Sequence, residues 1–389
     1  MTRIYLDNHA TTPVDPRVLE GMIPYFCETF GNAASVTHGF GREAARAVED
    51  ARSEVAQLIN AQPEEIVFTS GATEADNLAL KGVLEPYRAK GQHLVTVATE
   101  HKAVLDTCKS LVRSKLATAS YLPVSRDGLV DLNQLRDAIR PETILVSVMH
   151  SNNEIGVIQP LAEIARICHE KGVVLHTDAT QSAGKVPFDV KALDVDLASL
   201  SAHKMYGPKG VGCLYVRRRR PRPRLAALIS GGGHEGGLRS GTLPVPLIVG
   251  FGLASRFASK ELTAEATRVG KLRDRLREGL FHSVEGVHLN GHATERLPGN
   301  LNLSFEGVES DSLINALGDI ALSSSSACSS ATVEPSHVLR AMGVRDSLIY
   351  NAVRFGLGRF TTSEEIEEVL ARIPEAIGRL RRLQQAESK

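Results

Sequence analysis

The chain has 389 residues, which is long enough for two domains and a large buried core. Hydrophobic residues make up 42% of it and charged residues 23%, and the formal net charge is zero, which argues against a molecule that coats nucleic acid or a membrane through overall charge. No stretch approaches the roughly 20 apolar residues of a membrane span. Five cysteines without CxxC spacing argue against a zinc site or a disulfide framework, so no metal site and a reducing, cytoplasmic setting are expected.

Helical and strand-like segments alternate from about residue 42 to residue 216. Apolar residues at helical spacing predict helices over 48–59, 75–83 and 161–171, and a further one after His101. Apolar runs predict strands at 66–68, 94–97, 121–122, 143–149, 173–175, 195–200 and 211–216. This alternation favours a mostly parallel sheet covered by helices on both faces, in which ligands bind beyond the carboxyl ends of the strands.

From about Pro244 the pattern changes. A long helical stretch is predicted over 247–281. A smaller α+β unit follows, with strands near 301–305 and 353–357 and helices near residues 313, 337 and 366. Pro374 is expected to break or kink the last helix.

Residues 69–74 and Asp178 lie at predicted strand ends, and they suit the phosphate and the ring nitrogen of a single ligand. Residues 69–74 (TSGATE) lie between a strand and a helix, where small residues let backbone N–H groups and the helix dipole face a phosphate. Helix capping by Ser70 or Thr73 is the alternative reading. Asp178 follows a buried strand, and a protonated pyridine nitrogen would compensate its charge. A helix-capping role explains Asp178 alone about as well.

Two further residues complete the pattern. Lys204 lies in a loop at the mouth of the predicted sheet, where a desolvated amine can form a Schiff base, although most lysines are solvated surface charges. His101 follows the strand 94–97, and its ring can stack on a pyridine or move protons, although a lone histidine is more often structural. As a set, the four features predict pyridoxal 5'-phosphate as the cofactor.

Motifs along almost the whole chain carry a family resemblance. They are YLD (5–7), ATTP (10–13), FTSGATE (68–74), EHKAV (100–104), NNEIG (152–156), HTDATQ (176–181), HKMYGPKG (203–210), GGGHE (231–235), RSGT (239–242), SAC (326–328), EPS (334–336) and VRF (353–355). In this order they resemble the cysteine desulfurases of the IscS/NifS group, in the fold-type I aminotransferase class of pyridoxal-phosphate enzymes. The resemblance implies an α/β fold with a large domain, residues 16–258, built on a mostly parallel seven-stranded sheet between helices. It also implies a smaller α+β domain, residues 1–15 and 259–389, that carries the catalytic cysteine loop.

The resemblance assigns a role to each expected site residue. Lys204 would bind the cofactor covalently, Asp178 would pair with its ring nitrogen, Gln181 would contact the ring hydroxyl and His101 would stack on the ring. Asn153 and Arg354 would bind the substrate carboxylate, which the arginine fork suits, with Asn153 also near the cofactor. The phosphate would be held by Ala72, Thr73, Ser201, His203 and, from a second subunit, Thr242. This sharing implies a homodimer.

Cys328 differs from the other cysteines. It lies in the serine-rich stretch 323–330, which has nothing to anchor it in a core, whereas residues 27, 108, 168 and 213 lie in apolar or helical settings typical of packing. An exposed loop suits a thiol that must visit the cofactor and then an acceptor, although an incidental loop cysteine is the alternative. The hypothesis is a desulfurase that converts L-cysteine to L-alanine. Lys204 would remove the Cα proton, with His101 a candidate proton donor or acceptor. The Cys328 thiolate would attack the substrate sulfur.

The persulfide on Cys328 would pass to acceptors for iron–sulfur cluster assembly or other sulfur-containing products, and Cys328 could transiently ligate a cluster during transfer. Ser325 stands where the family usually has glycine, which suggests a stiffer loop. Gly236 and Gly356 replace a common arginine and a common serine. The chain ends at Lys389, without the longer tail with which IscS-type members dock the scaffold protein, so the acceptor stays open.

The run 217–224 (RRRRPRPR) is expected to form an exposed loop. A solvated surface and a dock for an acidic sulfur acceptor both explain it, and the lack of interleaved aromatic residues disfavours nucleic acid. Two other functions stay open at this point: a selenocysteine lyase of the same fold and a non-catalytic sulfur-relay protein.

Overall fold

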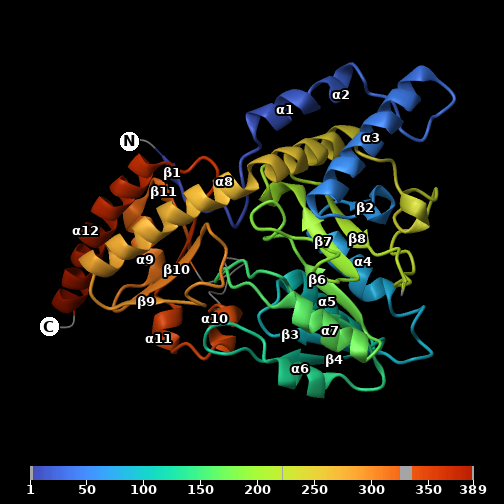
Figure 1. Ribbon diagram of the computed structural model, residues 1–389. Coiled ribbons are helices and arrows are strands. Elements are labelled where there is room, and N and C mark those ends of the chain that lie inside the picture. Colours follow the sequence, from blue (N-terminus) through green and yellow to red (C-terminus); the bar gives the residue numbers. More distant parts are fainter. Residues whose placement is uncertain (1–2, 221, 325–334, 388–389) are drawn as a thin grey trace.

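The computed structural model describes residues 3–220, 222–324 and 335–387 (Figure 1). Cys328 and Ser325 lie outside these ranges. Among the described residues no helix has both the length and the apolar character needed to cross a membrane.

A seven-stranded sheet with the order β2-β8-β7-β6-β5-β3-β4 organises the larger part of the chain. Its strands pair in parallel except for β8, which runs antiparallel to both β2 and β7. The predicted mostly parallel α/β sheet is therefore confirmed, with one reversed strand. The strands are β2 (Ile66–Thr69), β3 (His93–Val97), β4 (Thr118–Leu122), β5 (Thr143–Ser147), β6 (Val174–Asp178), β7 (Leu197–Ser201) and β8 (Gly212–Val216).

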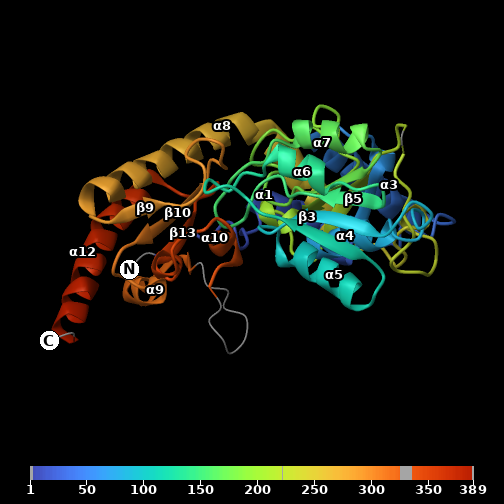
Figure 2. The same cartoon turned by 90° about the horizontal axis from the view of Figure 1, so that it is seen from below.

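Helices cover both faces of this sheet because neighbouring strand residues point to opposite sides. In β5, Leu145 packs with the core under α4 and α5, whereas Val146 packs with the core under α3, α6 and α7. Figure 2 shows α4 and α5 on one side of the sheet and α6 and α7 on the other. These helices are α3 (Gly39–Leu58), α4 (Ala72–Gly82), α5 (Lys102–Arg113), α6 (Leu132–Ala138) and α7 (Leu161–Glu170).

A second, four-stranded antiparallel sheet has its own core. Its order is β12-β13-β10-β9, and Leu301, Phe305 and Phe355 are buried beneath it. The elements are β9 (Val287–Leu289), β10 (Asn300–Phe305), β12 (Ser323–Ser324), β13 (Ala352–Gly356), α9 (Ser310–Leu317), α10 (His337–Ala341), α11 (Asp346–Ile349) and α12 (Ser363–Glu387). The chain's first strand, β1 (Ile4–Tyr5), pairs with β11 (Ile320–Ala321) beside this sheet.

The long helix α8 (Val245–Ser283) packs on both parts of the molecule (Figure 1). Its first half contacts α3 and the short helices α1 (Pro16–Met22) and α2 (Pro24–Cys27), and its second half contacts α12. The predicted boundary at residues 258–259 falls inside this helix, and the division into domains stays a prediction. The helix α12 continues across Pro374, so the expectation that this proline breaks the helix is wrong.

The expectation that the whole run 217–224 is exposed is also wrong. Arg217 is only 2% exposed, because its guanidinium lies 2.9 Å from Asp194 and 3.0 Å from Asp196. Pro223 is buried as well. The exposed part of the run consists of Arg218, Arg219, Arg220, Arg222 and Arg224.

Candidate active site

A cavity of about 500 Å³ opens at the carboxyl ends of β6 and β7. The strand ends and the N-termini of α4 and α5 converge there, as the alternating pattern of the sequence predicts. The structure brings nine of the expected site residues together in its lining: Ala72, Thr73, His101, Asn153, Asp178, Gln181, Ser201, His203 and Lys204.

One end of the cavity is formed by the N-terminus of α4. The first N–H groups of a helix have no intrahelical partner and favour an anion. The loop before α4 packs tightly on β8: a Cβ at Gly212 would lie 2.7 Å from the Cα of Gly71, so a side chain at 212 would push this loop away. Burial alone would raise the pKa of Glu74, but hydrogen bonds from Arg239 and Ser70 lower it. The Glu74 carboxylate is thereby bonded to Arg239 and to the Ser70 N–H. Because its negative charge is balanced by Arg239, the end of the helix can receive a phosphate.

Asp178 ends β6 at the floor of the cavity and is 5% exposed. Its Oδ1 accepts a hydrogen bond of 2.9 Å from the Thr180 N–H, and among the described residues no cation lies within ion-pair distance of it. Behind it lie two more acids, Asp76 and Glu100, whose pKa values are raised well above the usual range by burial and by the charge of Asp178. Asp178 is thus the acid of this group that faces the cavity, and it lacks the positive partner that a protonated ring nitrogen would provide.

Lys204 lies at the end of the short 3-10 helix Ala202–Lys204, directly after β7. Its Nζ donates hydrogen bonds to the backbone carbonyls of His9 (2.7 Å) and Ala10 (2.6 Å). Burial and the positive charge of Arg354 lower the pKa of Lys204 to about 8. Its amine is therefore partly neutral near physiological pH, which a lysine that attacks a carbonyl needs.

The loop after Lys204 is held in a strained conformation. Tyr206 has φ +65°, in the left-handed region that a residue with a Cβ rarely adopts. Its backbone N–H donates to Thr12 Oγ1 (2.9 Å) and its carbonyl accepts from the Asp15 N–H (2.9 Å). The N-terminal segment thus fixes the loop that positions the lysine.

His101 caps α5 at the mouth of the cavity. Its Nδ1 accepts a hydrogen bond of 3.1 Å from the Ala103 N–H, so the proton of the neutral ring is on Nε2. Desolvation by the surrounding protein lowers the pKa of His101; the charge of Asp178 opposes this shift, and the charges of Lys204 and His337 add to it. The ring is therefore neutral at pH 7 and presents an N–H donor.

His203 is a second neutral imidazole in the lining. Burial, assisted by the charges of Lys204 and Lys209, lowers the pKa of His203 to about 4. Its Nδ1 lies 3.0 Å from Thr11 Oγ1.

Arg354 lies in a second cavity, of about 1280 Å³, that shares His101 and Asn153 with the first. Its Nη2 donates to Asp7 Oδ1 (2.7 Å) and to Ser323 Oγ (2.8 Å), and its Nη1 donates to the Asn153 carbonyl (3.0 Å). These bonds hold the guanidinium at the wall between the two parts of the molecule. The two cavities are therefore neighbours that share two residues, and Arg354 lies in the wall of the larger one.

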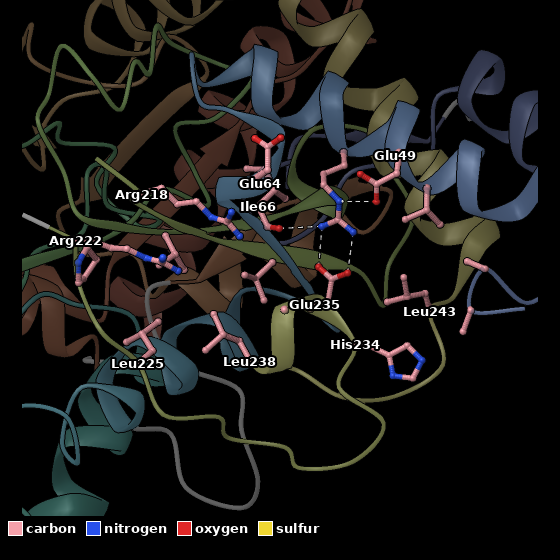
Figure 3. A pocket seen from close by; sticks show the side chains of 18 of the residues that line it. Glu49, Glu64, Ile66, Arg218, Arg222, Leu225, His234, Glu235, Leu238 and Leu243 are labelled. Atoms are coloured by element: carbon pink, nitrogen blue, oxygen red, sulfur yellow. Dashed lines mark hydrogen bonds and ion pairs between the residues drawn. The ribbon is translucent and has the colours of Figure 1, made fainter. Parts of the chain in front are cut away.

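Thr242 lies outside both cavities and is exposed. The next residue, Leu243, lines a separate cavity of about 1020 Å³ between α3 and the segment 234–243 (Figure 3). The Arg52 guanidinium bonds both carboxylate oxygens of Glu235 at 2.8 Å in this third cavity. Arg218 and Arg222 also line this cavity and lie in Figure 3 on the side of the view away from His234 and Leu243.

Three cysteines pack as the sequence predicts and one does not. Residues 108, 168 and 213 are buried, and burial raises the pKa of Cys108 to about 12. Cys27 is exposed, so its expected packing role is wrong. Cys328 lies outside the described residues.

Sequence reasoning missed three polar residues at the site: Asp7, His9 and Lys185. Asp7 bonds Arg354, and His9 and Lys185 bond Gln181. Asp7 lies inside the YLD motif and His9 directly precedes the ATTP motif, so a signal was present in the sequence. Lys185 follows Gln181 by four residues, but nothing in the sequence distinguishes it from a surface lysine.

Comparison with known proteins places the chain in a family. Residues 4–369 match the family model described as aminotransferase class-V. The chain therefore belongs to the aminotransferase class-V family of enzymes. Within it, the chain groups with the cysteine desulfurases. The protein named cysteine desulfurase IscS from Anaeromyxobacter dehalogenans (strain 2CP-C) is 58% identical, over 98% of this chain and 94% of the relative.

Other relatives agree. The protein of the same name from Dechloromonas aromatica (strain RCB) is 55% identical, over 98% of this chain and 93% of the relative. Among solved structures, a NifS-like protein has a TM-score of 0.90 at 41% identity and covers 97% of this chain and 100% of its own. A structure titled SspA in complex with cysteine has a TM-score of 0.81 at 37% identity and covers 93% of this chain and 100% of its own.

Proposed function

We propose that this enzyme is a pyridoxal-phosphate-dependent cysteine desulfurase that converts L-cysteine to L-alanine and carries the sulfur as a persulfide on Cys328. The observation that carries the proposal is the meeting of Lys204 and Asp178 in one cavity beside the N-terminus of α4. A desolvated amine, an acid without a cationic partner and an anion-binding helix end match the aldehyde, the ring nitrogen and the phosphate of this cofactor.

The residues of the cavity fit pyridoxal phosphate at each of its groups. Asp178 would hold the ring nitrogen, Gln181 the ring hydroxyl and Lys204 the aldehyde carbon, with His101 against the ring. Ala72, Thr73, Ser201 and His203 would hold the phosphate. When bound, the cofactor supplies an electron sink for the charge that develops at the substrate Cα.

The residues around the cofactor would divide the remaining work. Arg354 would bind the substrate carboxylate as a fork, helped by Asn153. Lys204, as a neutral amine, would take the proton from Cα. The Nε2–H of His101 would supply a proton at the mouth of the cavity.

Sulfur transfer would follow as an exchange between two sulfur atoms. The Cys328 thiolate attacks the substrate sulfur, so an S–S bond forms as the Cβ–S bond breaks. Cβ gains a proton, and L-alanine leaves. One cysteine and one thiol thus become alanine and a persulfide, with no outside oxidant or reductant.

We also propose that two copies of the chain share their active sites. From α2 to the first turn of α3, four large apolar side chains are each exposed by more than half: Phe26, Phe30, Val36 and Phe40. Phe30 and Phe40 pack together with ring centroids 5.7 Å apart. Exposed apolar side chains that lie together in this way are typical of an interface, and Phe30 and Phe40 are such a pair. Thr242, exposed and outside its own cavity, would hold the phosphate in the other copy.

The exposed arginines of the run 217–224 would dock an acidic sulfur acceptor in the cytoplasm, such as a scaffold for iron–sulfur clusters. Arg217 takes no part in this docking because it is buried in ion pairs with aspartates. Replacing Arg220 and Arg222 by glutamate should slow sulfur delivery to an acidic acceptor and leave alanine formation with a small thiol reductant unchanged. Equal delivery by the variant and the parent enzyme would remove the docking role.

Two measurements test the proposed activity. The purified protein loaded with pyridoxal phosphate should show a visible absorbance band that hydroxylamine removes, and it should release alanine from L-cysteine. Selenocysteine assayed in parallel separates a selenocysteine lyase. A protein that carries no such band, or forms no alanine, would refute the proposal.

A further inference from the structure

A hydrogen-bond network holds the Gln181 amide, and the two side chains that bond its oxygen, His9 and Lys185, are not among the residues that line the cavity. Gln181 Oε1 is 2.9 Å from Lys185 Nζ and 3.0 Å from His9 Nδ1, and Gln181 Nε2 is 2.9 Å from the His9 carbonyl. The same His9 carbonyl accepts the bond of 2.7 Å from Lys204 Nζ. The network therefore joins the amide that lines the cavity to the amine that would bind the cofactor.

The chemistry of the partners fixes the direction of every bond. A backbone carbonyl only accepts, so the end of the amide that faces it must be Nε2. The other end is then Oε1, an acceptor, and both Lys185 and His9 must donate to it. His9 consequently carries its proton on Nδ1. Its Nε2 is buried and has no partner among the described residues.

This arrangement decides what Gln181 offers to the cavity. Two donors occupy Oε1, and one hydrogen of Nε2 is used by the His9 carbonyl. The second hydrogen of Nε2 remains. Gln181 thus keeps one N–H without a partner among the described residues, and it lines the cavity.

Lys185 is a partly buried lysine without an acidic partner among the described residues. Among the described residues no carboxylate lies within ion-pair distance of it, and Glu265, whose negative charge acts on it from farther away, already bonds Arg359 at 2.7 Å. Burial and the neighbouring Lys204 lower the pKa of Lys185 to about 7. An enclosed amine without a counter-charge costs stability, and Gln181 Oε1 is the one acceptor that the described structure gives it.

We propose that Lys185, together with His9, is a positioning residue that holds the Gln181 amide with its N–H toward the ring hydroxyl oxygen of the cofactor. The donated hydrogen bond keeps that oxygen ionised. The inference rests on the proposed function, because it names a partner on pyridoxal phosphate.

The test is a pH titration of the visible absorbance of the cofactor-loaded enzyme without substrate. In Lys185→Met the Gln181 amide loses a hydrogen-bond donor to its oxygen and can turn. Negative charge on the ring oxygen of the cofactor is then less stabilised, so the pH midpoint of the absorbance change should rise by about one unit. Lys185→Gln keeps a neutral donor toward Oε1, so its midpoint should stay within about 0.3 units of the parent enzyme. Lys260→Met, at an exposed lysine of α8, is the matched control and should not move the midpoint.

Each outcome decides the matter. An unchanged midpoint in Lys185→Met overturns the inference, and so does an equal rise in Lys185→Gln, because charge and not hydrogen bonding would then be the cause. His9→Phe removes the second donor and serves if Lys185→Met does not fold: a raised midpoint supports the inference and an unchanged one overturns it. A parent enzyme without a visible band would instead refute the proposed function on which the inference stands.

Discussion

The Lys204 amine should take up pyridoxal phosphate with a pH midpoint near 8. The pKa of this amine falls from its ordinary 10.5 to about 8, through burial first and then through the charge of Arg354, while Asp178 and Asp7 act in the opposite direction. Only the neutral amine attacks the cofactor aldehyde, so the rate of uptake should rise with pH and level off above this pKa.

Two substitutions should move the midpoint in opposite directions. Arg354→Gln removes a positive charge and leaves Asp7 unpaired, so it should raise the midpoint. Asp7→Asn removes a negative charge and leaves Arg354 unpaired, so it should lower the midpoint. Each shift should be on the order of one pH unit, which corresponds to about 1.4 kcal/mol.

The assay follows absorbance after pyridoxal phosphate is added to cofactor-free enzyme across a series of pH values. His288→Gln, at a half-buried histidine of the smaller sheet, is the control and should keep the midpoint of the parent enzyme. A parent midpoint near 10.5, or shifts of the same sign in both charge variants, would refute the electrostatic reasoning.

Three further substitutions test other parts of the site and fold. Lys204→Ala should abolish alanine formation, and persistent turnover would mean that another group holds the cofactor. Cys328→Ser should keep the cofactor band and lose sulfide release, whereas unchanged turnover would exclude Cys328 as the nucleophile. Arg217→Met leaves two aspartates without their buried partner and should lower the free energy of unfolding by about 3–5 kcal/mol. Arg218→Met, at an exposed neighbour, should change it by less than about 0.5 kcal/mol, and equal losses in thermal unfolding would contradict this account.

The sequence predicted the large sheet because its strands are short apolar runs separated by amphipathic helices. That rhythm also predicted that residues 70–74 and Asp178 lie at strand ends, which is where they line the cavity. The antiparallel direction of β8 was not predictable, because an apolar run has the same pattern in either direction.

Contacts between distant residues were beyond such reasoning. Gln181 and His9 are 172 positions apart, and only the return of the N-terminal segment to the site brings them together. The burial of Arg217 also depends on contacts between residues that are distant in the sequence. It begins a run of exposed arginines, and its burial depends on Asp194 and Asp196, which a charge pattern along the chain does not reveal.

The most direct test is to incubate the enzyme with L-cysteine alone, count the alanine released and weigh the peptide that contains Cys328. The proposed chemistry predicts about one alanine per active site in a first rapid turnover and a peptide heavier by one sulfur atom. Alanine released with no added sulfur on that peptide would contradict the transfer to Cys328, and a heavier peptide without alanine would contradict cleavage of the substrate by this site.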